Sequence, residues 1–407
     1  MANTNAQGKV PNVAQHGYGS FRTDMFGRIK VSEGYVLFDS SHRYNENGDF
    51  SDITASGATV SHIAEQSSSA LTVSTTSGSK VLRETKKVFP YQPGKSLQIL
   101  QTFAFAPAKA NLRQRAGYFG RQNGFYLEQD GTNIYLVKRS YITGEVVETR
   151  IPQSQWNVDT LDGNGPSDIT LDLTKAQILF TEIEWLGVGA VRMGFAIDGY
   201  FIICHQFNHA NHIDSVYMTT ATLPIRYEIE NTGTTSSSST MKQVCVSVVS
   251  NGGYFKSSNP RHAIRTSTTV STTYYPLVAI RMPSNRTESV IIPGSIDLFP
   301  TSSADFDYAL IKNPTSITGG SWILHESLNV EYNISATAMV GGQKMLEGFF
   351  GATNQAVAGS SSDAGNFAFQ LGRTNADTPV SDVMVLAVRT VSGNGNVKSA
   401  LGWFDLL

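Results

Sequence analysis

Residues 117–131 read GYFGRQNGFYLEQDG, and four further runs of the same character follow before residue 232. Each run is short, rich in aromatic and β-branched residues and bounded by Gly, Asn or Asp, which favours strands joined by tight turns. No segment has a convincing apolar stripe with the 3.6-residue period of a helix, so backbone polar groups must pair between strands. The pattern therefore predicts an antiparallel β-sandwich; the further runs are TNIYLVKRSY (132–141), QILFTEIEWLG (177–187), AVRMGFAIDGYFIICHQF (190–207) and LPIRYEIEN (223–231).

The size and charge of the chain limit its class. With 407 residues it is longer than a single core usually grows, which predicts two domains. The 31 basic and 33 acidic residues nearly cancel, so no net field attracts nucleic acid or an anionic membrane. Residues 1–20 lack the apolar core of a signal peptide, and no apolar run approaches a membrane span. We expect a protein made in the cytoplasm without a signal peptide, with no nucleic-acid partner and no membrane insertion.

Shifts in composition predict where the domains begin and end. Residues 1–35 are rich in Gly, Asn and Gln and are expected to form an extended arm. Residues 36–255 are expected to form a large, concanavalin-like β-sandwich. Residues 256–273 lack apolar periodicity and are interpreted as a linker, and residues 274–407 contain about eight short strands, as in a jelly-roll. The predicted fold class is all-β, with two antiparallel β-sandwich domains behind an N-terminal arm.

The arm contains a segment, GSFRTDMFGRIKVS (19–32), that mixes apolar with basic side chains. A free arm of this composition cannot build its own core, so the mixture suits docking on a neighbouring surface. That surface belongs either to another subunit or to the arm's own domain. The candidate anchor residues are Phe21, Arg22, Met25, Phe26, Arg28 and Ile29.

The densest group of metal-ligand residue types is CHQFNHANH, which holds Cys204, His205, His209 and His212. Imidazole and thiolate bind zinc, but zinc motifs with histidines four apart use a helix, and this segment is predicted to be a strand entering a loop. We therefore expect no metal, and the three histidines remain weak candidates. The alternative is hydrogen bonding across a turn or a subunit contact. Cys204 and Cys245 are expected to be free buried thiols, with one bridge between neighbouring strands as the alternative.

Two carboxylates in TEIEWLG (181–187) invite comparison with glycosidases. Glu182 and Glu184 are two residues apart and share a face of the predicted strand, and retaining glycosidases use two carboxylates about 5 Å apart. A concanavalin-like glucanase carries Glu, Asp and Glu on such a strand, whereas here the third acidic position falls at Leu186 or Gly187. We expect no enzyme; the alternative to hydrolysis is a pair of solvent-facing glutamates, one of them bonded to Arg192.

A third group of residues suits the binding of a glycan, because aromatic rings stack on sugars and polar turns bond their hydroxyls. The candidate residues are Tyr118, Tyr126, Trp156, Asp159 and Asp162. The acidic turn around the two aspartates also offers oxygens for Ca²⁺, but it does not match a spaced-ligand loop, and an ordinary turn explains it. No cofactor is expected, since the motifs of nucleotide binding, of a nucleophile elbow and of cysteine catalysis are absent.

Several motifs in order resemble a family of β-rich virion structural proteins of tailed phages, notably those of cyanobacteria and other aquatic bacteria. The resemblance extends over nearly the whole chain. The motifs are FRTDMFGRIKVSEGYVLFDSSHRY (21–44), RAGYFGRQNGFYLEQDG (115–131), DGYFIICHQFNHAN (198–211), LPIRYEIEN (223–231), PLVAIRM (276–282), VIIPGSIDLF (290–299) and EYNISATAMVGG (331–342).

The resemblance implies a non-enzymatic structural component of the virion. Such a component is exposed as a tail, baseplate or fibre protein or as a head decoration, and we expect assembly through the arm. The implied partners are other copies of the chain, expected as a homotrimer, and other virion proteins. The alternative function is a receptor-binding module for a host surface glycan. A glycan depolymerase that uses Glu182 and Glu184 is the third hypothesis.

Overall fold

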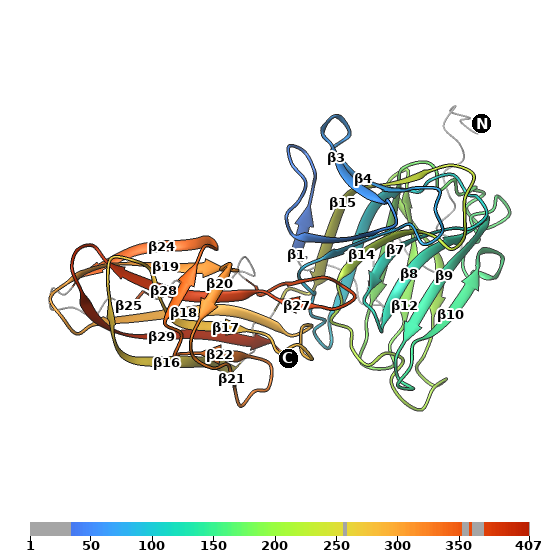
Figure 1. Ribbon diagram of the computed structural model, residues 1–407. Coiled ribbons are helices and arrows are strands. Elements are labelled where there is room, and N and C mark those ends of the chain that lie inside the picture. Colours follow the sequence, from blue (N-terminus) through green and yellow to red (C-terminus); the bar gives the residue numbers. More distant parts are fainter. Residues whose placement is uncertain (1–33, 255–258, 352–357, 360–369, 407) are drawn as a thin grey trace. The chain divides into compact units, whose positions relative to one another are not determined.

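The computed structural model describes residues 34–254, 259–351, 358–359 and 370–406 (Figure 1). In these residues the regular structure is β, apart from two short 3-10 helices, Ala64–Gln66 (η2) and Gln153–Gln155 (η3). All strand pairs of the two large sheets of residues 34–254 are antiparallel. The all-β class expected from the sequence is confirmed. The described residues include no helix with the length and apolar composition of a membrane span.

The chain divides into two compact units between Phe255 and Lys256. The first unit contains two sheets. The 8-stranded sheet runs in the order β13 (Tyr200–Phe207), β12 (Val191–Ile197), β11 (Gln177–Ile183), β6 (Ser96–Ala104), β15 (Ser239–Asn251), β4 (Ser68–Val73) and β3 (Thr59–Ile63), with β1 (Tyr35–Ser40) also paired to β15. The 7-stranded sheet runs in the order β10 (Val147–Pro152), β9 (Asn133–Ser140), β8 (Gly124–Asp130), β7 (Leu112–Phe119), β14 (Ile225–Asn231), β5 (Lys80–Thr85) and β2 (Phe50–Ala55).

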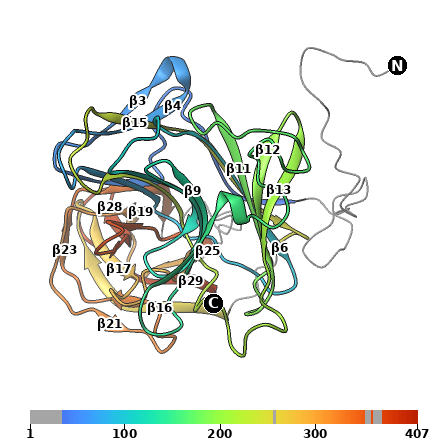
Figure 2. The same ribbon diagram turned by 90° about the vertical axis from the view of Figure 1, so that its right-hand side faces the viewer.

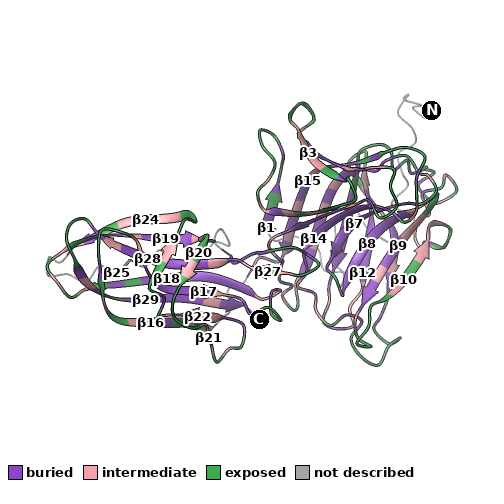
Figure 3. Cartoon of the chain, viewed as in Figure 1, coloured by how far each residue is buried: buried purple, intermediate pink, exposed green. Residues whose placement is uncertain are grey.

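The inner faces of these two sheets form the core of the first unit. Because side chains alternate along a strand, every second residue turns inwards. Ile99 and Leu179 of the 8-stranded sheet are buried, as are Phe125 and Tyr227 of the 7-stranded sheet. Figure 2 shows β11, β12 and β13 next to one another in the first unit, and Figure 3 shows long buried stretches on β7, β8 and β12.

The outer face of the 7-stranded sheet carries a network of ion pairs that we call the charge lattice. Arg115 donates to Glu128 over 2.6 Å and to Glu228 over 2.9 Å, and both carboxylates lie opposite it on the neighbouring strands. Burial alone would raise the pKa of Glu228, but Arg226, Arg115 and Arg139 hold this pKa at about 2. The lattice consists of Glu84, Arg113, Arg115, Glu128, Asp130, Arg139, Glu148, Arg150, Arg226, Glu228 and Glu230.

The second unit is also a sandwich. Its 4-stranded sheet runs in the order β16 (Asn259–Val270), β29 (Gly395–Leu406), β18 (Val290–Pro300) and β25 (Ala358–Gly359). Its 6-stranded sheet runs in the order β21 (Ile323–Leu324), β22 (Glu331–Asn333), β17 (Tyr275–Arg281), β28 (Val383–Thr390), β19 (Asp305–Lys312) and β24 (Gln343–Gly351). Two small two-stranded sheets pair β20 (Ser316–Thr318) with β23 (Ala338–Val340) and β26 (Arg373–Thr374) with β27 (Val380–Ser381).

The core of the second unit lies between its two large sheets. Trp403 and Leu401 of β29 are buried in one cluster with Phe306 of β19 and Leu386 of β28. This cluster joins residues from both sheets, so the unit has a hydrophobic core of its own, as a domain requires.

The segment predicted as a linker, residues 256–273, differs from the expectation. Residues 259–270 form β16, which pairs along β29 from Asn259 to Val270. This strand has an open edge and one exposed face, so it needs few apolar residues, and among residues 260–270 only Ala263 and Val270 are buried core side chains. An edge strand of this kind lacks the apolar signal by which strands are recognised in a sequence. The predicted anchor residues, all between residues 21 and 29, lie outside the described residues.

Candidate functional site

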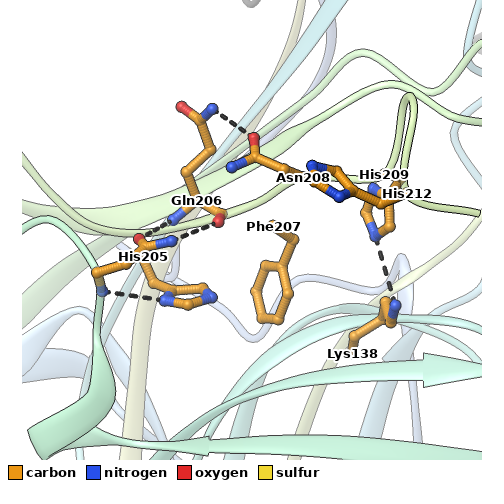
Figure 4. Close-up of a pocket in the computed structure, with 8 residues that line it drawn as sticks. Lys138, His205, Gln206, Phe207, Asn208, His209 and His212 are labelled. Carbon is orange, nitrogen blue, oxygen red and sulfur yellow. Dashed lines mark hydrogen bonds between the residues drawn. The ribbon is translucent and has the colours of Figure 1, made fainter.

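A pocket of about 360 Å³ opens at the side of the first unit, beside the edge strand β13. One lining residue comes from the other sheet, so the pocket lies where the margins of the two sheets approach each other. Figure 4 shows Phe207 between His205 on one side and Lys138 on the other. The lining residues are Lys138 of β9, Asn157 after η3, and His205, Gln206, Phe207, Asn208, His209 and His212 of β13 and the loop that follows it.

A bulge in β13 sets the orientation of the pocket wall. Met193 of β12 lies opposite His205, whereas the next residue, Gly194, lies opposite Ile203, so β13 carries one extra residue here. Gly194 is required at this point, because a Cβ atom on it would lie 2.0 Å from the carbonyl oxygen of Ile202. After the bulge, His205 and Phe207 share one face of the strand and meet edge to face, with ring centroids 4.5 Å apart.

His205 is held as a neutral imidazole with a defined tautomer. Its Nδ1 accepts a hydrogen bond from the backbone N–H of Asn157 over 3.2 Å, so the ring proton is on Nε2. Burial lowers the pKa of His205 to about 4. The side chain of Asn157 also bonds both backbone groups of Gln206, each over 2.9 Å. These bonds fix the pocket wall to the segment that follows η3.

His209 has the opposite tautomer. Its Nδ1 donates to the carbonyl oxygen of Gly189 over 2.8 Å, and its ring stacks on Tyr217 with centroids 3.8 Å apart. Burial and, to a smaller extent, the charges of Lys138 and His212 lower the pKa of His209 to about 4, although the bond to Gly189 opposes this shift. The free Nε2 is therefore an acceptor, and the Lys138 ammonium lies 3.4 Å from it. Burial also lowers the pKa of Lys138.

The three histidines named as weak metal candidates are not arranged as a ligand set. In the described part of the chain, no three His, Cys, Asp or Glu side chains come together as metal ligands. The Nδ1 atoms of His205 and His209 are already bonded to the protein, and His212 is exposed. Both cysteines are free, with Cys204 buried and Cys245 partly buried.

The two glutamates considered for hydrolysis are buried and have separate partners. Glu182 accepts a hydrogen bond from Ser96 Oγ over 3.0 Å and pairs with Arg192 over 3.7 Å. The pairing with Arg192 on the next strand agrees with the expectation. Glu184 follows the end of β11 and accepts from the Tyr91 hydroxyl over 3.2 Å. The expectation that both face solvent is wrong, because both are buried.

The residues predicted for glycan binding are not brought together. Tyr118 is buried, and its hydroxyl donates to backbone carbonyl oxygens. Tyr126 is buried under the arginines of the charge lattice and donates to Glu148, and Trp156 is buried with its Nε1 bonded to the Ile151 carbonyl oxygen. None of these three rings therefore offers an open face to a sugar in this structure.

The two predicted aspartates stabilise their own turn. Asp159 is buried and accepts hydrogen bonds from the backbone N–H groups of Leu161 and Ser167. Asp162 is exposed and accepts from the Thr160 hydroxyl and the backbone N–H of Asn164. The bonds from Leu161 N–H and Asn164 N–H are ordinary Asx-turn bonds, and the bond from Ser167 N–H closes the longer loop, so the two carboxylates are used to shape this turn.

Sequence reasoning found the histidines of the pocket but missed Lys138, Asn157, Gln206, Phe207 and Asn208. No local signal placed Lys138 in the pocket. It shares a strand face with Leu136, but Arg139 shares the other face with Val137, so alternation alone does not decide which of the two basic residues turns inwards. Asn157 enters only through a contact between distant segments.

Neither a protein-family model nor a curated protein matches the chain. Among solved structures, the GH16 protein of the Bacteroides ovatus mixed linkage glucan PUL is similar over 52% of this chain and 99% of its own, at 10% identity and a TM-score of 0.36. The carbohydrate recognition domain of Emp47p is similar over 54% and 97%, at 10% identity and a TM-score of 0.35. A structure from the endo-acting O-glycanases of the human gut microbiota covers 53% and 99%, at 14% identity and a TM-score of 0.38. At these identities and TM-scores, the similarities assign neither a functional residue nor an activity to this chain.

Proposed function

We propose that the first unit is a glycan-binding module whose site is the pocket beside β13. The observation that carries this proposal is the lining itself. Side-chain amides and neutral imidazoles, which offer both donors and acceptors, surround a space of about 360 Å³ together with one phenyl ring. This volume is within the range of sites for small ligands, about 300–1,000 Å³. Sugar hydroxyl groups both donate and accept, and they match such a lining.

We propose binding without hydrolysis. Cleavage of a glycosidic bond uses two carboxyl groups at the bond. The described residues that line the pocket include no Asp or Glu. Glu182 and Glu184, the carboxylates first considered for this chemistry, are buried with other partners.

Asn208→Ala is expected to weaken glycan binding several-fold to about tenfold, because it removes one hydrogen-bonding amide from the pocket. Binding of the full-length protein to an array of bacterial surface glycans identifies the ligand, and titration of the best glycan measures the effect. Asn164→Ala, at an exposed position in the Asp159–Asp168 turn, is the matched control and should bind as the wild type does. Equal losses in the two variants, or an array without any bound glycan, would count against this site.

A second proposed role is assembly into a phage particle as a structural component exposed on its surface, which the resemblance of the sequence motifs implies. One structural observation supports it. Strand β24 ends the 6-stranded sheet, and among the described strands only β19 pairs with it. Phe349 of β24 is 80% exposed. An open edge with an exposed phenyl ring suits pairing with another protein chain. The two proposed roles are compatible, since a particle protein can also bind a host glycan.

If the arm anchors the chain, Phe21→Ala combined with Phe26→Ala should leave both units folded and remove the protein from the particle. Each phenyl ring, if fully buried on a partner, contributes roughly 1.5–3 kcal/mol. Mass spectrometry of purified particles measures incorporation, and cryo-electron microscopy shows where the wild-type copy lies on the head or tail. Normal incorporation of the double variant would refute the anchoring role.

A further inference from the structure

Lys138 is a half-buried cation with which no carboxylate of the described residues forms an ion pair. Its side chain turns into the first unit from β9, and its one described hydrogen-bond partner is Nε2 of His209. Among the described residues, no Asp or Glu forms an ion pair with it, whereas Arg83 and Arg115 in the same unit each pair with two or more carboxylates. A partly buried charge without compensation is costly, so an ammonium group that is kept in this state points to a ligand that supplies the negative charge.

Two further donors line the same pocket. The tautomer of His205 leaves its Nε2–H without a partner in the described residues, because Nδ1 is the atom that accepts from Asn157. The side-chain oxygen of Asn208 accepts from the Gln206 amide over 2.6 Å, which leaves the NH₂ group of Asn208 free to donate. His209 cannot neutralise the ammonium, because its free Nε2 carries no charge. The pocket therefore offers one cation and, on the other side of Phe207 from it, the His205 donor, and none of the described lining residues is a carboxylate.

We propose that this pocket binds an oxyanion, the carboxylate or sulfate group of an acidic glycan. Lys138 pairs with the charge, and His205 Nε2–H and the Asn208 amide are left to donate to hydroxyl oxygens of the attached sugar. Hydrogen bonds between charged groups are roughly twice as strong as neutral ones, so this group would contribute much of the affinity. The oxyanion itself is inferred from Lys138, and its attachment to a sugar rests on the proposed function.

The experiment compares matched ligands on the full-length protein. An array presents uronate-containing and sulfated oligosaccharides, each beside its carboxyl-reduced or desulfated counterpart, so that each pair differs only in the anionic group. We expect each acidic ligand that binds to do so at least about tenfold more tightly than its neutral counterpart. Lys138→Met should abolish this difference. Lys175→Met, which removes an exposed lysine outside the pocket, should preserve it. His205→Asn keeps an acceptor for the Asn157 N–H and removes the Nε2–H donor, so it should weaken acidic and neutral ligands alike and preserve the difference.

Each outcome separates the two proposals. Equal binding of acidic and neutral partners, or a preference that survives in Lys138→Met, would overturn the oxyanion site while leaving glycan binding intact. If no glycan binds, the proposed function fails, and titration with inorganic sulfate decides the remaining question. Sulfate that shifts the NMR signals of the His209 ring, which lies 3.4 Å from the Lys138 ammonium, in the wild type but not in Lys138→Met would support an anion site for a ligand that is not a sugar. An absence of that shift would overturn it.

Discussion

Replacing Arg115 with alanine is expected to lower the free energy of unfolding of the first unit by about 3–5 kcal/mol. Arg115 is buried and donates to Glu128 and Glu228, which are also buried. Its removal leaves these carboxylates with less positive charge around them, in a place that water reaches poorly. The loss of stability arises mainly from the buried carboxylates that remain. Removing one partner of a buried ion pair destabilises a protein more than replacing the whole pair with apolar residues does.

Arg113→Ala is the matched control for this prediction. Arg113 precedes Arg115 by two residues on the same face of β7 and pairs with Glu230, but its side chain is 29% exposed. Its loss should therefore cost only about 0–1 kcal/mol. Hydrogen exchange at increasing denaturant, measured on peptides from β7, β8 and β14, reports this unit separately from the second one. Equal effects of the two substitutions would show that the charge lattice is ordinary surface charge.

The stability of the first unit is expected to fall steeply as the pH drops from about 6.5 to about 4. His42, His205 and His209 are buried, and burial lowers the pKa of each to about 4. Between these pH values the unfolded chain binds protons that the folded chain does not, so acid favours unfolding. Each histidine contributes a slope of about 1.4 kcal/mol per pH unit, which amounts to about 4 kcal/mol per pH unit for all three.

Glu228 of the charge lattice should not add to this slope. The pKa of Glu228 is held at about 2, so its contribution is present above the ordinary pKa of a glutamate and is lost only as the pH falls towards 2. Denaturation midpoints between pH 4 and 7 measure the slope. His205→Asn, which keeps the acceptor for the Asn157 N–H, should reduce it by about one third. His212→Asn, at an exposed position in the loop, is the control. A flat profile for the wild type would contradict the neutral state of the pocket.

The fold was largely accessible from local sequence. The run 117–131 forms the hairpin β7–β8, with Tyr118 opposite Phe125, because its residues favour strands and Gly124 permits the turn. What local sequence could not provide was the face on which each aromatic ring lies. Tyr118 bonds backbone carbonyl oxygens in the interior, and Tyr126 lies under arginines on the opposite face, yet both had seemed equally suitable for a sugar.

Only part of the pocket could be predicted from the sequence, because some of its residues come from distant segments. His205 and His209 are close in the sequence, so their cluster was visible, and their different tautomers were not. Lys138 and Asn157 reach the pocket through the pairing of strands and the course of a loop after η3, which depend on long-range packing. Open-edged β16 was missed for a related reason, since its partner β29 lies more than one hundred residues away.

The segment that follows η3 also affects the tendency of the protein to aggregate in concentrated solution. Strand β13 ends its sheet, and its outward backbone groups at Cys204 and Gln206 are occupied by the N–H groups of Val158 and Asp159 and by the side chain of Asn157. A free edge of this kind is where chains stack into aggregates. The residues that shape the pocket wall thus also close this margin to a passing strand. A substitution of Asn157 should therefore affect two properties together. It should reduce the solubility of the protein, because the edge of β13 opens, and it should reduce ligand binding, because the pocket wall loses its support.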